Sequence, residues 1–342
     1  MRSPLSDRTI VAFYHDPPLW VGTNPVDRAN GMRLDLELLN QEVFRRKLSC
    51  GIELRVSIEG IFAFDFTDWT PGRRPSQDLI DADFDELANA AVNRTYAMNA
   101  FLSFLYTRRA VHDKFSHGRM VVTPELEITT DNIDMEGAQG FGNNRVSHLA
   151  LSRFISTYSM TSPPAFDSRI LSRNVPISET AVTHAAEDFS TVVSRGGLQD
   201  VLLLDLFLRA SKAFQDHNYS LSIINYWAVI EKLIGILWKN MQDDYRHRDG
   251  VVFIDGARRR RLDDGRTFTA AVVIEMLSFN NYIDNQTYDD LTRIRKVRNE
   301  WMHNLRPASA DSAKLAGEIC AGLLKKAKDY VVISTAARSI HG

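Results

Sequence analysis

Apolar and polar residues alternate in the first part of the chain, which predicts strands. In "GIELRVSIEGIFAFDFTDW" (51–69) the even-numbered positions from Ile52 to Phe66 are mostly apolar, and most of the odd-numbered positions are polar. A period of two predicts a half-buried antiparallel strand, with Gly60 at a bend or bulge. "TIVAFYH" (9–15) and "GRMVVTPELEITTDN" (118–132) also have strand character.

A helical period replaces this alternation in the second half of the chain. Before it, the segment 81–115 already predicts one long helix, with acids near its start and bases towards its end. Further helices are predicted at 177–197, 200–217, 219–245, 291–305 and 309–332. Ser178 is a candidate cap of the first of these, and Gly196 and Gly197 end it.

These elements predict an α+β chain with two domains. Residues 1–180 are expected to form a mixed domain of antiparallel strands and helices, and residues 181–342 an all-α four-helix bundle. The stretch 246–268 lies between two predicted helices and has the character of an inserted hairpin or loop. It carries four consecutive arginines, Arg258, Arg259, Arg260 and Arg261.

Composition narrows the class of protein. The chain has 342 residues, 44% hydrophobic residues and a net charge of −2, so contact with a nucleic acid would have to come from a local patch. Its two cysteines, Cys50 and Cys320, form no zinc motif, and no secretory signal or membrane-spanning run is evident. We therefore expect a cytoplasmic protein with no metal ion, no cofactor and no membrane contact.

One predicted helix places a charge within its apolar stripe. In "LTRIRKVRNEWMHNL" (291–305), Leu291, Ile294, Trp301 and Leu305 recur at helical spacing, and Arg298 occupies the position between them. A buried guanidinium destabilises a fold unless it is paired. The pattern therefore predicts either an acidic partner for Arg298 or a ligand or solvent at this position.

Polar residues flank that arginine. Asn299 and His303 are four residues apart and share the edge of the stripe, and Arg295 extends this polar column by one turn. Glu231 is the lone acid of the apolar run "YWAVIEKLIGILW" (226–238). We expect Glu231 to approach Arg298 or Arg295 across a pair of helices.

These residues resemble the HEPN domain family, whose members often cleave RNA, and the Apea-like branch most closely. The resemblance covers about residues 198–335. It consists of four helices in order, an acid in the second helix (Glu231 in "YWAVIEKL"), and an R-x4-6-H motif late in the third, here Arg298–His303 with Asn299 after the arginine. The resemblance implies a HEPN-like four-helix bundle.

It also implies a function. Those members that cleave RNA do so without a metal ion, at a site that two protomers form at a homodimer interface. The ribose 2′-OH attacks the adjacent phosphate, and a 2′,3′-cyclic phosphate remains. His303 would transfer protons, Arg298 would stabilise the developing charge, and Asn299 would orient the phosphate or the histidine. The arginines at 258–261 would contact RNA phosphates, and a defence or toxin-like role would follow.

Other interpretations of the same residues stay open. Arg298 could serve only as a structural ion pair with Glu231, His303 could only interact with the helix dipole, and the arginine run could be a solvated loop. The helical part would then be a non-catalytic dimerisation module, with an N-terminal domain that binds an unknown ligand or partner. An accessory role beside nucleotidyl transfer is a third possibility, although the chain carries no transferase signature.

Overall fold

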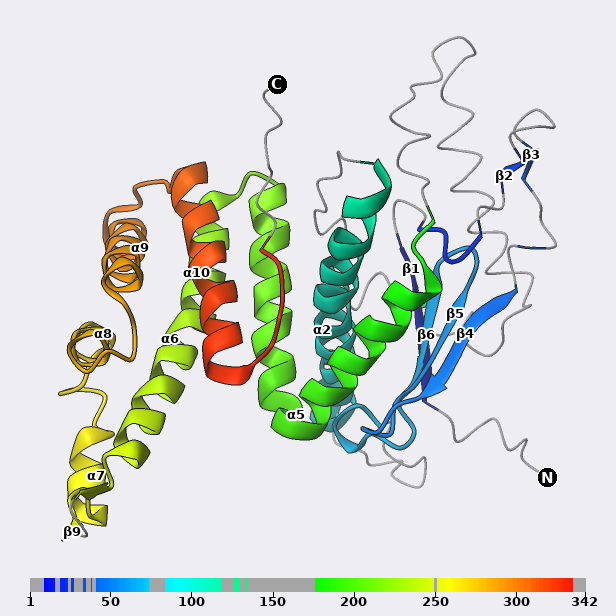
Figure 1. Cartoon of the computed structure of the whole chain (residues 1–342). Coiled ribbons are helices and arrows are strands. Elements are labelled where there is room, and N and C mark those ends of the chain that lie inside the picture. The colour runs from blue at the N-terminus through cyan, green and yellow to red at the C-terminus, as the bar shows by residue number, and fades with distance from the viewer. Residues whose placement is uncertain are drawn as a thin grey trace. The chain divides into compact units, whose positions relative to one another are not determined.

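The alternating segments near the N-terminus form an antiparallel sheet (Figure 1). The structure is a computed structural model and describes residues 9–15, 19–23, 26–27, 33–34, 38, 41–73, 84–117, 126–129, 133–134, 176–248 and 251–334. The strand order is β4-β5-β6-β1-β7, where the strands are β1 (Ile10–Tyr14), β4 (Glu42–Lys47), β5 (Glu53–Ser57), β6 (Ile61–Asp65) and β7 (Ile133–Asp134). A separate short pair joins β2 (Val26–Asp27) to β3 (Arg33–Leu34).

The segment 51–69 is a hairpin and not one bent strand. β5 and β6 pair with Val56 opposite Phe62 and Leu54 opposite Phe64, so residues of the same parity still share one face of the sheet. The alternation is therefore compatible with one bent strand and with a hairpin of two strands. The tight turn at Gly60 makes the segment a hairpin. Gly60 has φ +84°, and a Cβ there would lie 2.2 Å from the carbonyl oxygen of Leu19. Only glycine allows this turn and this approach.

Two helices cover the sheet and build an aromatic core. α2 (Phe84–His117) contributes Phe101 and α5 (Glu179–Gln215) contributes Phe189, and both rings lie edge-on to Phe64 of β6. Phe13 of β1 stacks on Phe62 at 5.2 Å between ring centroids. The long helix that the sequence predicts over 81–115 is thus confirmed.

α5 consists of two helical segments that meet at Gly197, where φ is 56° and ψ is −148°. A Cβ at the preceding Gly196 would lie 1.8 Å from a carboxylate oxygen of Asp200. The two glycines therefore end the first segment, as the sequence predicts, but the chain turns and continues at once as a second one. Ser178 also caps as predicted, because its hydroxyl accepts a hydrogen bond from the Ala181 amide at 3.1 Å.

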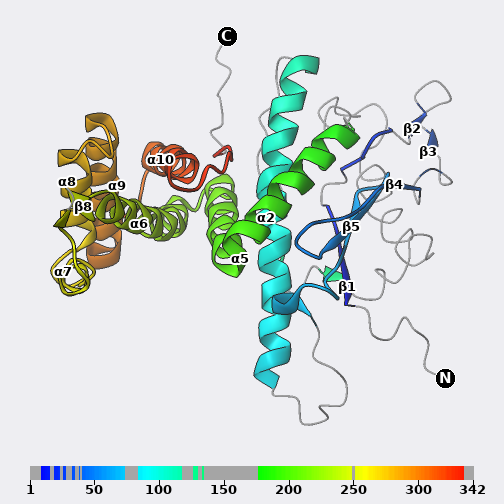
Figure 2. The same cartoon turned by 60° about the horizontal axis from the view of Figure 1, so that its bottom comes forward.

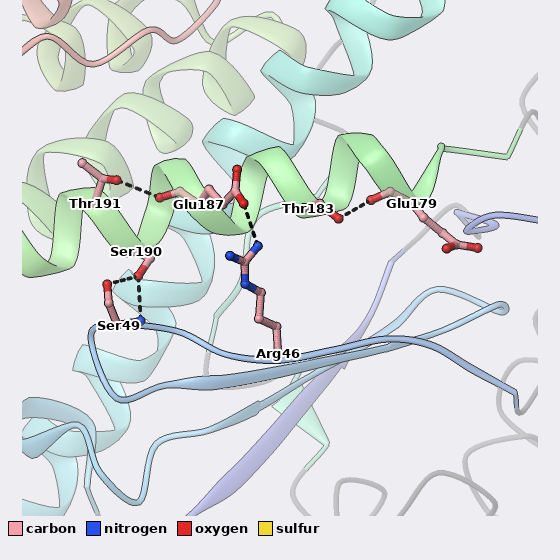
Figure 3. A network of polar contacts seen from close by, with 7 residues as sticks. All are labelled: Arg46, Ser49, Glu179, Thr183, Glu187, Ser190 and Thr191. Atoms are coloured by element: carbon pink, nitrogen blue, oxygen red, sulfur yellow. Dashed lines mark hydrogen bonds and ion pairs between the residues drawn. The ribbon is translucent and has the colours of Figure 1, made fainter.

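The first segment of α5 is also tied to the edge of the sheet by polar contacts. Figure 3 shows Arg46 of β4 paired with Glu187 at 2.7 Å, and the backbone N–H of Ser49 donating to the Ser190 hydroxyl at 3.1 Å. The contacts lie at the exposed edge strand, where charged side chains discourage pairing with another chain.

The domain border falls later than the sequence predicts. The first compact unit ends at Asp205 and the second begins at Leu206, inside α5, and not at residues 180–181. The reason is physical: the first segment of α5 buries Phe189 against the sheet, so it belongs with the strands. A helical period alone does not show which core a helix serves.

The second unit is helical within its described residues. After the end of α5 it contains α6 (Tyr219–Asp244), α7 (Gly256–Leu262), α8 (Ala270–Phe279), α9 (Asn285–Asn304) and α10 (Ala310–Lys328), with a small hairpin of β8 (His247–Arg248) and β9 (Val251–Val252) before α7. α6 packs against α8, α9 and α10, and the views in Figures 1 and 2 show α10 beside α6 and the α8–α9 pair crossing α6.

α6 is long and apolar enough to cross a membrane by length and composition, yet 56% of its apolar window is buried inside the structure. That burial is typical of the core helix of a water-soluble protein.

One predicted strand is not seen. Of the segment 118–132 the structure describes only 126–129, which has no regular secondary structure, and the rest lies outside the described residues. The α2 side chain of Asn99 holds this piece instead, because it donates to the Ile128 carbonyl at 3.1 Å and accepts from the Ile128 amide at 2.7 Å.

Candidate functional site

The candidate site lies on α9, a helix with well-defined ends. Asp284 caps its start, because its carboxylate accepts a hydrogen bond from the Thr287 amide at 2.7 Å, and this bond holds the pKa of Asp284 below its usual value. The helix ends at Leu305, which takes the left-handed conformation with φ 53°, and its N–H bonds to the carbonyls of Glu300 and Trp301. His303 therefore lies in the last turn of α9.

The apolar stripe of α9 is only partly buried. Leu291 and Ile294 are fully buried and Trp301 is half-buried, but Leu305 is 71% exposed. The predicted packing of Leu305 is thus wrong, because this residue ends the helix and does not belong to its buried apolar stripe. Met302 is also 50% exposed, so the C-terminal end of α9 presents apolar side chains to solvent.

Arg298 is half-buried beside this end of the helix. Its guanidinium Nη1 donates a hydrogen bond to Oδ1 of Asn299 at 3.0 Å, and it forms no ion pair with any residue that the structure describes. A cation in such a position keeps donors available for an anion. The first two residues of the predicted site are therefore in contact with each other.

His303 is exposed, and no described side chain is hydrogen-bonded to it. It follows Arg298 by five positions on α9, so the two side chains do not lie one directly above the other. Asn299, by contrast, precedes His303 by four positions, which places the amide and the imidazole on the same face. Within the described residues the guanidinium forms no ion pair and can bind a phosphate, and the exposed imidazole of the same helix end can exchange protons with a ligand.

The predicted supporting contact of Glu231 is wrong. Glu231 is exposed on α6, and within the described part of the chain no ion pair joins it to Arg298 or to the half-buried Arg295. The residue lies instead at the wall of a cleft between α6 and the start of α8. The sequence placed Glu231 correctly at the border of an apolar face, but the crossing angle of two helices decides which neighbour it meets.

The arginine-rich insertion folds into the β8–β9 hairpin and the short helix α7. Asp255 caps α7 by accepting a hydrogen bond from the Arg258 amide at 2.7 Å, and Arg259 pairs with Asp243 of α6 at 2.7 Å. Arg260 and Arg261 are exposed and pair with no described acid. Two of the four arginines therefore carry charge that is free for an anionic partner.

Aromatic and acidic neighbours define the surroundings of these arginines. The Arg258 guanidinium lies 4.2 Å above the centre of the exposed Phe253 ring and donates to the carbonyl of the same residue at 3.2 Å. Asp264 accepts from the Arg266 amide and the Thr267 hydroxyl, so it serves the local turn. Among the described residues it forms no ion pair with the arginine run.

Sequence reasoning missed the cleft that Glu231 borders. This cavity of about 530 Å³ is formed by α6, the segment 262–268 and the start of α8. Its aromatic wall contains Trp238 and Phe268, whose rings stack at 5.4 Å between centroids. The one available signal was a glycine, Gly235, inside the mostly apolar run 226–238 of a helix.

Within the described residues, no group of three or more His, Cys, Asp or Glu side chains is placed so that it could hold a metal ion. Comparisons of the chain with known protein families, with curated proteins and with solved structures find no match.

The structure itself gives the fold class, which is α+β, with an antiparallel N-terminal sheet and a mostly helical remainder.

Proposed function

We propose that the chain is a metal-independent endoribonuclease of the HEPN type, acting as a cytoplasmic homodimer. Its HEPN-like bundle would comprise the second segment of α5 with α6, α9 and α10, which follow one another in the order that the family resemblance requires. The single observation that carries the proposal is Arg298, a half-buried arginine with no acidic partner among the described residues, on the helix whose last turn presents His303.

The chemistry follows from these side chains. The 2′-oxygen of a ribose attacks the neighbouring phosphorus as its proton leaves to a base, and the 5′-oxygen departs with a proton, so the products are a 2′,3′-cyclic phosphate and a 5′-hydroxyl. His303 provides one of these proton transfers. Arg298 stabilises the charge on the equatorial oxygens, and Asn299 fixes the direction of the guanidinium through their hydrogen bond.

A second protomer would supply the second proton-transfer group. Each chain brings one histidine to this position, whereas the reaction needs a base and an acid. Met302 and Leu305, beside His303, expose apolar surface that a symmetry-related copy would cover. Arg260 and Arg261 would bind RNA phosphates, and the sheet-containing unit would sense a ligand or partner in a defence or toxin-like setting.

The test is cleavage of mixed single-stranded RNA in EDTA. We expect the wild type to cleave, and His303→Ala and Arg298→Ala to lose about 100-fold or more of the rate. Arg293→Ala and His247→Ala are matched controls, because both residues are exposed and lie outside the site. A wild-type dimer that leaves every RNA intact would favour the non-catalytic dimerisation module.

A further inference from the structure

The cleft beside Glu231 has the volume of a binding site for a small ligand. Its volume of about 530 Å³ lies within the range of roughly 300–1,000 Å³ that is usual for ligand sites. It lies wholly in the second unit, between the C-terminal half of α6, the segment after α7 and the first turn of α8. None of the residues discussed for the catalytic motif on α9 lines it.

Two glycines keep the cleft open. A Cβ built at Gly235 or at Gly265 meets no described atom within 4 Å, and neither residue has a left-handed φ. Nothing in the packing or the backbone conformation therefore calls for glycine at either position. In the interior of α6 a glycine even destabilises the helix relative to alanine. What the missing side chain at Gly235 provides is a bare stretch of helix on the surface of the cleft, which a flat ligand can approach closely.

The remaining wall is aromatic and is fixed in place. Trp238 stacks on Phe268 and its Nε1–H donates to the carbonyl of Leu262 at 3.1 Å, which holds the indole against the segment after α7. Trp238 itself is only 5% exposed, so the half-buried Phe268 ring is the aromatic surface that the cleft offers. Rings of this kind stack with nucleobases irrespective of sequence.

Polar groups of opposite charge line the cleft and would orient a ligand in it. Glu231 lies one turn before Gly235 and Lys239 one turn after it, so a carboxylate and an ammonium group flank the bare stretch of α6. Glu231 pairs with no described cation. A carboxylate accepts two parallel hydrogen bonds, and guanine is the common base that offers two adjacent donors, N1–H and N2–H.

The cleft is continuous in sequence with the exposed arginines. Leu262 and Asp263, which line it, directly follow Arg260 and Arg261 at the end of α7. Cations next to a cleft for a planar ring match the repeating unit of a nucleic acid, in which each base carries a phosphate.

We propose that this cleft binds one nucleotide of single-stranded RNA, preferably a guanosine. The base lies on the bare stretch at Gly235 against the Phe268 ring, which the buried Trp238 supports. Glu231 accepts its donors, and Arg260 and Arg261 contact the adjoining phosphates. The proposal deepens the ribonuclease function and rests on it for the identity of the ligand, but binding is measured apart from cleavage.

The experiment is fluorescence anisotropy with labelled RNA and the full chain carrying His303→Ala, so that the RNA stays intact. Two short oligonucleotides are compared, one of uracils only and one with a single central guanine. We expect the guanine to tighten binding about tenfold, and Glu231→Gln to remove most of this preference, because a bidentate pair is lost. Gly235→Leu should abolish the preference by filling the cleft.

Gly322→Leu is the matched control, since Gly322 is also a glycine in a helix, and its Cβ would also meet no described atom within 4 Å. It should fold like Gly235→Leu and bind like the parent. Equal binding by the two leucine variants, or no preference for the guanine in the parent, would overturn the proposal. Competition by guanosine monophosphate as strong as by the RNA would show that the cleft serves a free nucleotide, and would overturn the RNA assignment.

The outcome is separable from that of the nuclease test. If the protein binds RNA in a guanine-dependent way but the wild type cleaves no RNA, the proposed binding cleft stands and the proposed ribonuclease function fails. If cleavage depends on His303 and Arg298 but not on Gly235, the ribonuclease function stands and the proposed binding cleft fails.

Discussion

At the scale of single residues, Arg298 is the most informative side chain. The sequence shows its position inside an apolar stripe, and it also shows that Asn299 and His303 lie on the same predicted helix. What the sequence could not show is the partner, because ion pairing between helices depends on crossing angles and not on spacing along one helix. The structure leaves Arg298 half-buried with only Asn299 as a hydrogen-bonding neighbour in the described chain.

A stability measurement separates a catalytic arginine from a structural one. Replacing Arg298 with Met removes a half-desolvated charge that has no ion pair among the described residues, and keeps an unbranched apolar chain in place of the arginine's aliphatic part. We expect the free energy of unfolding in urea to stay equal or to rise by up to about 1 kcal/mol, while cleavage is lost. Arg293→Met, on the exposed side of α9, is the control. A fall of several kcal/mol for Arg298→Met alone would mean that the arginine holds the fold together.

Gly317 tests packing at the same scale. A Cβ at Gly317 would lie 3.0 Å from Cζ and Oη of Tyr226, a fully buried ring whose hydroxyl is hydrogen-bonded to Ser211 at 2.7 Å. That ring has little room to move, so Gly317→Ala should destabilise the protein by about 1–3 kcal/mol. Gly322→Ala on the same helix should instead stabilise it by about 0.5–1 kcal/mol. Chemical denaturation decides, and a gain in both variants would show that α10 can shift away from α6.

At the scale of elements, the sequence predicted where helices form better than it predicted where they end and which core they pack against. The long helix α2, the break at Gly197 and the Ser178 cap all follow from local signals that act within a turn or two. The hairpin at Gly60 was not predicted, because parity alternation is the same in one strand and in two paired strands. The sequence predicts a hairpin or loop where the short helix α7 forms, because a run of four arginines shows no apolar period, although Asp255 caps the helix.

The start of α9 should show its own pH dependence. Because the hydrogen bond from the Thr287 amide lowers the pKa of Asp284, the cap stabilises the helix fully above the ordinary pKa of an aspartate. Its contribution is lost as the pH falls through the lower pKa of the folded state. Asp284→Asn keeps a capping side chain but removes the titration. The difference in unfolding free energy between wild type and variant should shrink below about pH 4, and a difference that stays constant down to pH 2 would contradict the cap.

At the scale of the whole molecule, the sequence predicted an α+β chain and the structure confirms that class, with the border between units inside α5. For the cleft, the sequence held one local signal, Gly235, but it could not show the cleft itself, because α6, the segment 262–268 and α8 form it together. The proposed catalytic groups, by contrast, lie within six residues of one helix, which is why the sequence could suggest them.

Analysis of RNA ends by mass spectrometry, after incubation of the wild-type chain with RNA in EDTA, tests the central proposal most directly. We predict products that end in a 2′,3′-cyclic phosphate and begin with a 5′-hydroxyl, and no cleavage at a position where the 2′-OH has been replaced by hydrogen. Products with 5′-phosphates, cleavage at the 2′-deoxy position, or identical products from His303→Ala would contradict the assignment of Arg298 and His303 to a metal-independent ribonuclease site.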